Sequence, residues 1–383
     1  MKQRLIVNRR TVVAGLGAVT FASTRSAIAQ DAGGGGGKLV IVILRGALDG
    51  LAAAPPTGEE RVAQYRPQLI TQSNLPITDG FSLHPALENL HALYGKGEAA
   101  VMHAAAGPWR DRSHFRAQDL LESGTSGDVL NDGWLNRAMT VAPTPLTAVS
   151  IGGVTPLILR GPAMTTSWSP SVLPEADDDT IARLLDLYEA DELLGPALAQ
   201  AVAMDEDLAM EGGRGRSRGN DFQTPLAAAG RLLTAENGAD IAVVSLGGWD
   251  THANQTATLN RRLGQLDKGL KALQAELGGY WQNTMIAVAT EFGRTIRQNG
   301  TKGTDHGTGG VAFALGGAVA GGRLLGDWPG LAPTALYENR DLYPANDLRG
   351  LFKGMLEAQF GLSARDLSIT VFPDSASIAS LSV

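Results

Sequence analysis

The sequence of 383 residues has no cysteine. This absence excludes disulfides, thiolate nucleophiles and zinc or iron–sulfur sites with cysteine ligands. An excess of positive charge is also missing, since 32 Lys and Arg oppose 39 Asp and Glu for a net charge of −7. No overall basic field exists to attract nucleic acid, and we expect no nucleic-acid partner. Hydrophobic residues make up 44% and charged residues 19%, which is typical of a globular chain.

The N-terminal segment has the composition of an export signal. A basic head with the pair Arg9-Arg10 precedes a short run of small apolar residues, and Ala27-Ile28-Ala29 offers a cleavage site. The pair resembles a twin-arginine signal, which predicts cleavage of residues 1–29, the twin-arginine translocase as a partner during export, and a periplasmic or secreted product. The alternative is a membrane anchor, but the run is too short to span a bilayer. After cleavage we expect no membrane association.

Residues 30–37 form a glycine-rich linker, and residues 38–383 are expected to form a single domain. Apolar, β-branched runs alternate with helical patterns along this domain. That alternation predicts an α/β fold with a doubly wound, mostly parallel sheet and helices on both faces. An arginine-containing stretch at 211–220 is expected to be a solvated loop, with a phosphate-binding patch as the alternative. The predicted strands are 39–44, 99–102, 147–151, 241–246 and 285–289, and the predicted helices are 85–93, 114–121, 180–194, 256–277 and 348–360.

Acids and histidines follow several of the predicted strands. Because the carboxyl ends of parallel strands meet at one edge, these side chains should gather there. Carboxylates with imidazoles are a ligand set for zinc, manganese or calcium. Other readings stay open, since Asp250 and His252 could form only a turn, and Glu291 with Arg294 only an ion pair. The candidate metal ligands are Asp49, Asp250, His252, Glu291, Asp305 and His306.

A second group surrounds the start of the helix predicted at 114–121. Ser113 is suited by type to cap this helix, and a helix N-terminus favours an anionic ester beside a hydroxyl. Arg112 and Arg116 could hold a tetrahedral oxyanion through bidentate contacts. His114 either supports such a site or caps the helix, and Ser113 could equally be an ordinary cap without chemistry.

Together these motifs resemble the alkaline phosphatase superfamily, which includes arylsulfatases, and more closely the DUF1501 family of exported proteins. The resemblance covers the chain from about Lys38 onward and implies an alkaline-phosphatase-like fold. The motifs that carry it, in order, are Leu44–Gly50, Ser113–Gln118, Gly247–His252, Thr290–Arg294 and Asp305–Gly307.

The resemblance also implies a mechanism, in which two metal ions about 4 Å apart hold a phosphate or sulfate ester and activate a hydroxyl. Ser113 would then be the nucleophile and His114, Arg112 and Arg116 its catalytic neighbours. The metal ligands would be Asp49, Asp250, His252, Glu291 and His306, with Asp305 a further ligand or an orienter of His306.

The implied function is an exported, metal-dependent hydrolase acting on an anionic ester, with zinc as the expected metal and manganese or calcium as alternatives. The chain departs from the superfamily pattern at Glu291-Phe292, where an active alkaline phosphatase has Asp-His. Phenylalanine cannot bind a metal, so the number of ions falls to one or two, or to none. The alternative function is a non-catalytic periplasmic binding module on the same fold with a degenerate metal site.

Overall fold

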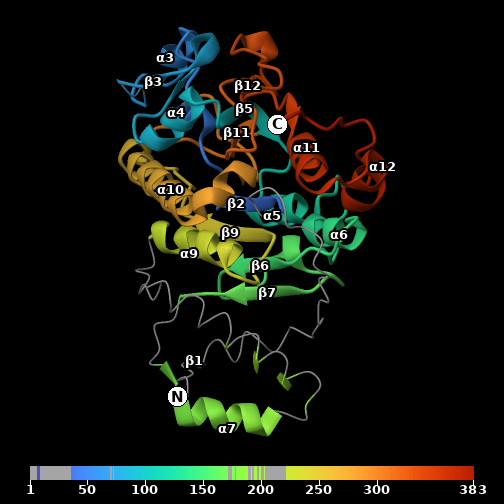
Figure 1. The fold of residues 1–383 in the computed structure, drawn as a ribbon. Coiled ribbons are helices and arrows are strands. Elements are labelled where there is room, and N and C mark those ends of the chain that lie inside the picture. The colour runs from blue at the N-terminus through green and yellow to red at the C-terminus, as the bar shows by residue number, and fades with distance from the viewer. Residues whose placement is uncertain are drawn as a thin grey trace.

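Figure 1 shows a computed structural model of the chain, with a central sheet between helices. The predicted export signal lies outside the described residues except for the two residues of strand β1 (Val7–Asn8), and the arginine-containing stretch at 211–220 lies outside them entirely. The structure describes residues 7–8, 36–69, 71, 73–170, 175–176, 178–188, 191, 194–195, 198–199, 202 and 221–383.

The main sheet has nine strands in the order β12-β5-β11-β10-β2-β9-β6-β7, with β13 also paired to β5. Five neighbouring strands, from β10 to β7, run parallel, as the sequence predicts. The strands are β2 (Lys38–Arg45), β5 (Ala99–Ala106), β6 (Ala148–Ile151), β7 (Thr165–Trp168), β9 (Ile241–Gly247), β10 (Thr284–Thr290), β11 (Gly310–Leu315), β12 (Leu324–Leu325) and β13 (Asn346–Asp347).

Both faces of the sheet are covered because the central strands are apolar on both sides. In β2, Leu39, Ile41 and Ile43 pack into one core with helices α5 (His114–Ser123), α6 (Trp134–Val141) and α11 (Leu348–Phe360). The alternate residues of β2 pack into a second core with α4 (Glu88–Gly95), α9 (Gln223–Thr234) and α10 (Gln255–Leu277). A strand buried on both faces reads as a continuous hydrophobic run. The predicted fold class is confirmed.

Strand β11 was not predicted, and it shapes the carboxyl edge of the sheet. It runs antiparallel to both β10 and β5, so its first residue, Gly310, lies at the edge where those strands end. The segment just before β11 therefore reaches the same edge as the segments just after β2, β9 and β10. Residues far apart in the sequence converge there, at the place where open α/β sheets bind ligands.

Smaller elements surround this body. Strand β1 pairs with β8 (Glu175–Ala176), and β3 (Leu75–Pro76) pairs with β4 (Ser82–Leu83). The predicted helix at 180–194 corresponds to α7 (Asp178–Tyr188). The short helices are α2 (Gly50–Ala53), α3 (Arg61–Tyr65) and α12 (Ala364–Asp366). Among the described helices, none has the length and apolar character needed to cross a membrane.

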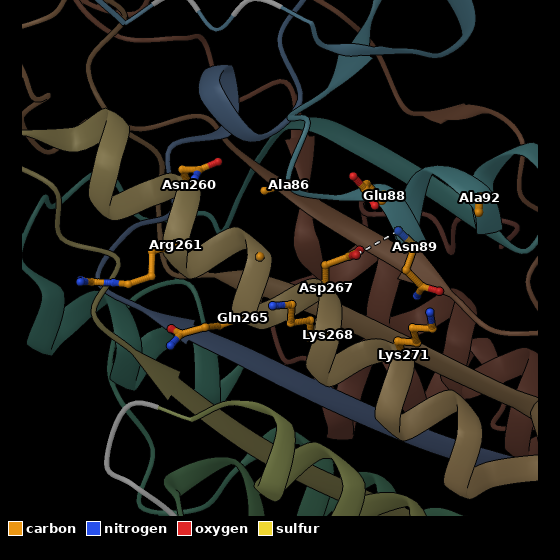
Figure 2. A pocket seen from close by; sticks show the side chains of 11 residues that line it. Ala86, Glu88, Asn89, Ala92, Asn260, Arg261, Gln265, Asp267, Lys268 and Lys271 are labelled. Carbon is orange, nitrogen blue, oxygen red and sulfur yellow. Dashed lines mark hydrogen bonds between the residues drawn. The ribbon is translucent and has the colours of Figure 1, made fainter.

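A groove of about 830 Å³ runs between α4 and α10. Figure 2 shows Asp267 of α10 reaching the first turn of α4, where its carboxylate accepts hydrogen bonds from the backbone N–H groups of Asn89 and Leu90, each at 2.9 Å. A carboxylate at a helix N-terminus satisfies free N–H groups and complements the helix dipole. Asp267 thus fixes α4 against α10, and burial raises the pKa of its carboxyl above the ordinary value.

Candidate metal centre

Three histidines from separate segments meet at the carboxyl edge of the sheet. His114 is the first residue of α5, His252 follows β9, and His306 precedes β11. The Nε2 atom of His306 lies 3.0 Å from Nε2 of His114 and 3.0 Å from Nε2 of His252. His114 also stacks on Phe292, with ring centroids 4.9 Å apart. Phe292 therefore forms an apolar wall beside the cluster.

The other ring nitrogen of each histidine faces an oxygen that can only accept a hydrogen bond. The Nδ1 atom of His114 lies 2.7 Å from Glu291 Oε1, and that of His252 lies 3.1 Å from Asp305 Oδ1. His306 places Nδ1 2.8 Å from the backbone oxygen of Arg112. These partners assign a proton to every Nδ1 atom, and in a neutral ring the proton there leaves Nε2 with a free lone pair.

Three Nε2 lone pairs therefore point into one small space, where they repel one another. Positive charge between the Nε2 atoms relieves this repulsion, and it can come from protons on two of the rings or from a single metal cation. Tetrahedral zinc with Zn–N distances of about 2.0 Å holds its ligand nitrogens about 3.3 Å apart, close to the spacing found here. Imidazoles that donate Nδ1–H to an oxygen and offer Nε2 inward are the usual form of histidine metal ligands. The residues present fit a metal.

Asp250 adds a carboxylate to this group. Its Oδ1 atom lies 3.0 Å from His252 Nε2 and 3.4 Å from His306 Nε2, and its Oδ2 atom lies 3.5 Å from His114 Nε2. His114, Asp250 and His306 have ligand atoms within 4.8 Å of one another, so these three could hold a metal ion. The side chain of Asp250 is 41% exposed, so one side of the group is open to solvent.

Arg294 fixes the position of Asp250. Its fully buried side chain donates from Nη1 to Asp250 Oδ1 at 2.6 Å, and it also donates to the backbone and hydroxyl oxygens of Thr304. Burial favours the neutral form of Asp250, but the hydrogen bond and charge of Arg294 outweigh it and lower the pKa of that carboxyl. Asp250 is therefore held as an anion beside the three rings.

Glu291 supports the cluster through its contact with His114. Its side chain is fully buried, and Oε1 accepts hydrogen bonds from the Gly46 backbone at 2.8 Å, Gln118 at 3.0 Å and His114 at 2.7 Å, while Oε2 accepts one from Thr290 at 2.9 Å. Burial alone would raise its pKa, yet the hydrogen bonds from His114 and Gln118 lower the pKa below the ordinary value. Both oxygens accept hydrogen bonds, and the one from His114 orients that ring, while the expected role of Glu291 as a metal ligand stays a prediction.

Asp305 orients His252 through a hydrogen bond in the same way. Its carboxylate accepts hydrogen bonds from Asn299 and from His252, each at 3.1 Å, and these lower its pKa. Three carboxylates, those of Asp250, Glu291 and Asp305, and one guanidinium, that of Arg294, surround the imidazoles, which are neutral when each ring carries its proton on Nδ1 alone. The resulting local charge of −2 is what one divalent cation would neutralise.

The titration of the histidines reflects these contacts. The hydrogen bond from Glu291 raises the pKa of His114, against the opposing effect of burial. Burial lowers the pKa of His306, and the neighbouring His114 adds to this effect. The pKa values of the two rings are thus shifted in opposite directions although their Nε2 atoms are neighbours. Such opposed shifts are typical of a functional site.

Asp49 lies outside this cluster. Its carboxylate is 1% exposed and accepts two hydrogen bonds from Arg66 Nη1, at 2.9 and 2.7 Å, and one from Gln255 at 2.5 Å. Gln255 in turn accepts a hydrogen bond from Thr304, which Arg294 contacts. Asp49 therefore connects to the cluster through a buried network, and its expected role as a metal ligand stays a prediction.

Ser113 lies in the chain between two residues of the site, Arg112 and His114. The backbone oxygen of the preceding Arg112 holds His306, and the following residue is His114. Ser113 occupies the N-cap position of α5, as predicted, but its hydroxyl makes no capping hydrogen bond, while its backbone N–H donates to Asp111 at 2.9 Å. The hydroxyl is therefore not used by the helix it precedes.

The two arginines expected to hold an oxyanion are engaged elsewhere. Arg112 donates to Asp341 at 3.0 Å and to Glu338 at 2.6 Å. Arg116 is exposed and donates to the backbone oxygen of Gly127 at 3.2 Å. The structure brings neither guanidinium into the histidine cluster.

Sequence reasoning underestimated two residues. The sequence predicts His114 to support the site or to cap the helix, whereas its Nε2 atom lies among the candidate ligand atoms. A structural ion pair of Arg294 with Glu291 is the alternative left open for Glu291, whereas Arg294 pairs with Asp250. The signal for His114 was its position four residues before Gln118, which puts both on one face of α5 and lets both contact Glu291.

The fold and site define an α/β protein with a candidate metal centre at the carboxyl edge of a mostly parallel sheet. The family model for DUF1501, described as a protein of unknown function, matches residues 37–370, and the chain belongs to this family. No curated protein matches the sequence.

Several solved structures are similar at low identity. An alkaline phosphatase from the Antarctic bacterium TAB5 shares 13% identity over 75% of this chain and 94% of its own, with a TM-score of 0.36. The lipoteichoic acid synthase LtaP from Listeria monocytogenes shares 12% identity over 98% and 82%, with a TM-score of 0.37. The 2-O GAG sulfatase BT1596 shares 10% over 74% and 64%, with a TM-score of 0.33.

Proposed function

We propose that this protein is a metal-dependent hydrolase of phosphate or sulfate esters with one metal ion per chain and Ser113 as nucleophile. The observation that carries the proposal is the convergence of three Nε2 atoms and the Asp250 carboxylate, with every Nδ1 atom held by an oxygen. The order of the motifs, which resembles that of alkaline phosphatases and arylsulfatases, supplies the reaction class.

Zinc is the metal that this donor set suits best. Three imidazoles and a carboxylate match zinc sites, whereas calcium takes oxygen ligands almost exclusively. We take one ion rather than two, because the carboxylates of Asp49 and Glu291 already accept hydrogen bonds from Arg66, Gln255, His114 and Gln118. We therefore expect one ion, held by His114, His252 and His306, with the fourth position taken by Asp250 in the resting protein and by an ester oxygen when substrate binds.

When bound, the metal would act as a Lewis acid that polarises the ester oxygens and favours an ionised hydroxyl beside it. Ser113 Oγ would form the bond to phosphorus or sulfur while the bond to the ester oxygen breaks, and its proton would pass to water. The departing oxygen would take a proton from solvent, and water would then release the acid from Ser113. Arg112 positions this step, because its backbone oxygen fixes the His306 ring next to Ser113.

The alternative function, a binding module without catalysis, is favoured by one observation. Asp49, one of the ligands expected for a two-ion mechanism, is buried against Arg66, and the described residues offer a single group that could hold a metal ion. Such a module would keep the fold, with a degenerate metal site, and bind an anionic ligand without turnover.

The deciding experiment measures zinc content and ester hydrolysis on the same preparation. One zinc per chain with hydrolysis of p-nitrophenyl phosphate or sulfate, lost on chelation and in S113A, supports the hydrolase, since removing a nucleophile costs several orders of magnitude. One zinc without turnover supports the binding module. A metal-free chain that takes up no zinc on titration and hydrolyses neither ester contradicts the hydrolase and supports the binding module.

We propose further that residues 1–29 direct the folded protein through the twin-arginine translocase. Because that route carries folded proteins, zinc could be inserted before export. The double variant R9K/R10K keeps the charge of the pair and removes both guanidinium groups, so it should stay in the cytoplasm. Its presence in the periplasm would contradict the assignment.

A further inference from the structure

Arg45, the last residue of β2, has its guanidinium at the carboxyl edge of the sheet. Nη1 donates to Gln118 Oε1 at 2.9 Å, and Nη2 donates to Glu122 Oε1 at 2.5 Å and to Ser245 Oγ at 3.3 Å. Its side chain is 29% exposed. We propose that Arg45 and Ser245 form a subsite that binds the tetrahedral oxyanion of the substrate beside the metal centre. This inference rests on the proposed function, because the metal centre is taken to hold the same ester.

The backbone just after Arg45 packs against the segment that carries a candidate metal ligand, Asp250. The Trp249 N–H faces the Arg45 carbonyl oxygen at 3.4 Å. Gly46 has φ of +117°, and a Cβ atom there would lie 2.7 Å from the backbone nitrogen of Asp250. Only glycine allows the chain after β2 to run this close to the chain after β9. The strand that ends in Arg45 is thus packed against the segment that carries Asp250.

Helix α5 places the guanidinium on its metal-facing side. His114 and Gln118 are four residues apart and lie on one face of the helix, where both bond to the same oxygen of Glu291. Arg45 bonds to Gln118 from that side. Arg116, two residues after His114, points to a different face of the helix and bonds to Gly127. Of these two arginines, Arg45 is the one that shares the His114 face.

The surface around Arg45 is open although it lies over the middle of the sheet. Strand β9 lies between β2 and β6, and its residues Ile241 and Val243 are fully buried on the face that packs against α5. Ser245 and Gly247 continue the same alternation, yet both are exposed. The helices therefore leave this end of β9 uncovered, and a ligand can reach the Ser245 hydroxyl and the Arg45 guanidinium together.

Glu122 holds the guanidinium in place for this role. Its side chain is 3% exposed, and its second oxygen accepts a hydrogen bond from the Ile158 backbone at 3.1 Å. A guanidinium has five N–H donors, so these contacts orient it while others remain for an anion. Because Glu122 also neutralises its charge, Arg45 alone should bind an anion weakly. We expect strong oxyanion binding only when the metal adds its own positive charge.

The test uses calorimetric titration of the zinc-loaded protein with inorganic phosphate and with sulfate. R45Q should weaken binding of phosphate at least tenfold and S245A by a smaller factor, while zinc stoichiometry and zinc affinity stay unchanged. R160Q, which alters an exposed arginine that donates to the Thr155 backbone oxygen, is the matched control and should bind phosphate as the unaltered chain does. R45K should recover part of the loss, because it restores the charge without the bidentate geometry.

Two results would overturn the assignment. One is unchanged phosphate affinity in R45Q with zinc bound. The other is simultaneous loss of zinc and phosphate in R45Q with wild-type phosphate affinity in S245A, which would make Arg45 a support of the fold. Zinc titration of the unaltered chain is read separately. If that chain takes up no zinc, the proposed function fails first, whereas zinc uptake with no phosphate binding overturns only the subsite.

Discussion

Arg294 donates a hydrogen bond of 2.6 Å to Asp250 from a side chain with no solvent exposure. The same guanidinium holds Thr304, which directly precedes the Asp305-His306 segment. One buried cation therefore fixes both the carboxylate that follows β9 and the loop that carries the third histidine. Arg294 sets the geometry of the site without reaching the surface.

Replacing Arg294 with lysine should loosen this geometry. A lysine ammonium is a point charge and cannot reproduce the fork that holds Asp250 and Thr304 together. We expect R294K to lower zinc affinity about tenfold, the lower end of the effect known for residues that orient metal ligands, with one zinc per chain retained. Competition against a chromogenic zinc chelator measures this. The control is R297K, since Arg297 is exposed and lies over the Tyr65 ring; equal affinities in the two variants would refute the role of Arg294.

Glu291 should control how well His114 binds a metal. In E291Q the amide can still accept one hydrogen bond, but the negative charge that makes the His114 ring a stronger ligand is gone. Zinc affinity should fall between about 10- and 100-fold. Isothermal titration with zinc measures the change, and E276Q serves as control because Glu276 forms a half-buried ion pair with Arg231. If Glu291 were itself a metal ligand, the stoichiometry would change as well.

Asp49 should matter for stability more than for metal binding. D49N leaves the Arg66 guanidinium buried and unpaired, which we expect to lower the free energy of unfolding by about 3 kcal/mol. The double variant D49N/R66M removes both charges and should recover much of that loss. Urea unfolding gives the stabilities, and zinc analysis should find the same content in all three proteins. A folded D49N protein without zinc would instead establish Asp49 as a ligand.

His103 should make the metal-free protein less stable in weak acid. Burial lowers its pKa from 6.5 to about 4, and its ring is fixed by the Ala54 carbonyl oxygen and the Ala104 N–H. Below pH 6.5 the unfolded chain takes up a proton that the folded chain refuses until about pH 4, so stability falls as pH drops through this window.

Between pH 7 and pH 5 the contribution of His103 amounts to about 2 kcal/mol. Urea unfolding of the chelator-treated protein at these two pH values should show a smaller loss for H103Q than for the unaltered chain. An identical loss in both proteins would mean that His103 is already protonated in the fold.

Much of the sheet could be predicted because each central strand carries its own signal. The run from Leu39 to Leu44 is apolar throughout, and such a run has few alternatives to a strand buried on both faces. Strand β11 (Gly310–Leu315) has a weaker signal, because glycines precede it and read as a loop. Its antiparallel direction depends on pairing with β5 and β10, which its own residues do not specify.

The site was predictable in its residue types and less so in their roles. Asp250, His252 and His306 follow or precede strands, so their convergence follows from topology. The partners that decide each role are distant in the sequence. Asp49 pairs with Arg66, and Arg112 pairs with Glu338 and Asp341. His114 pairs with Glu291. A single sequence contains no information on which of several possible charges will meet in space.

The three histidines also bear on how this chain is held together. His306 is 192 residues from His114 and 54 from His252, and all three meet at one point. A chain without cysteine has no disulfide cross-link available, and a single ion coordinated there would tie the same distant segments into closed loops. Loading with metal would then cross-link these segments as a disulfide does in other proteins, and the loaded chain should resist proteases better than the metal-free chain.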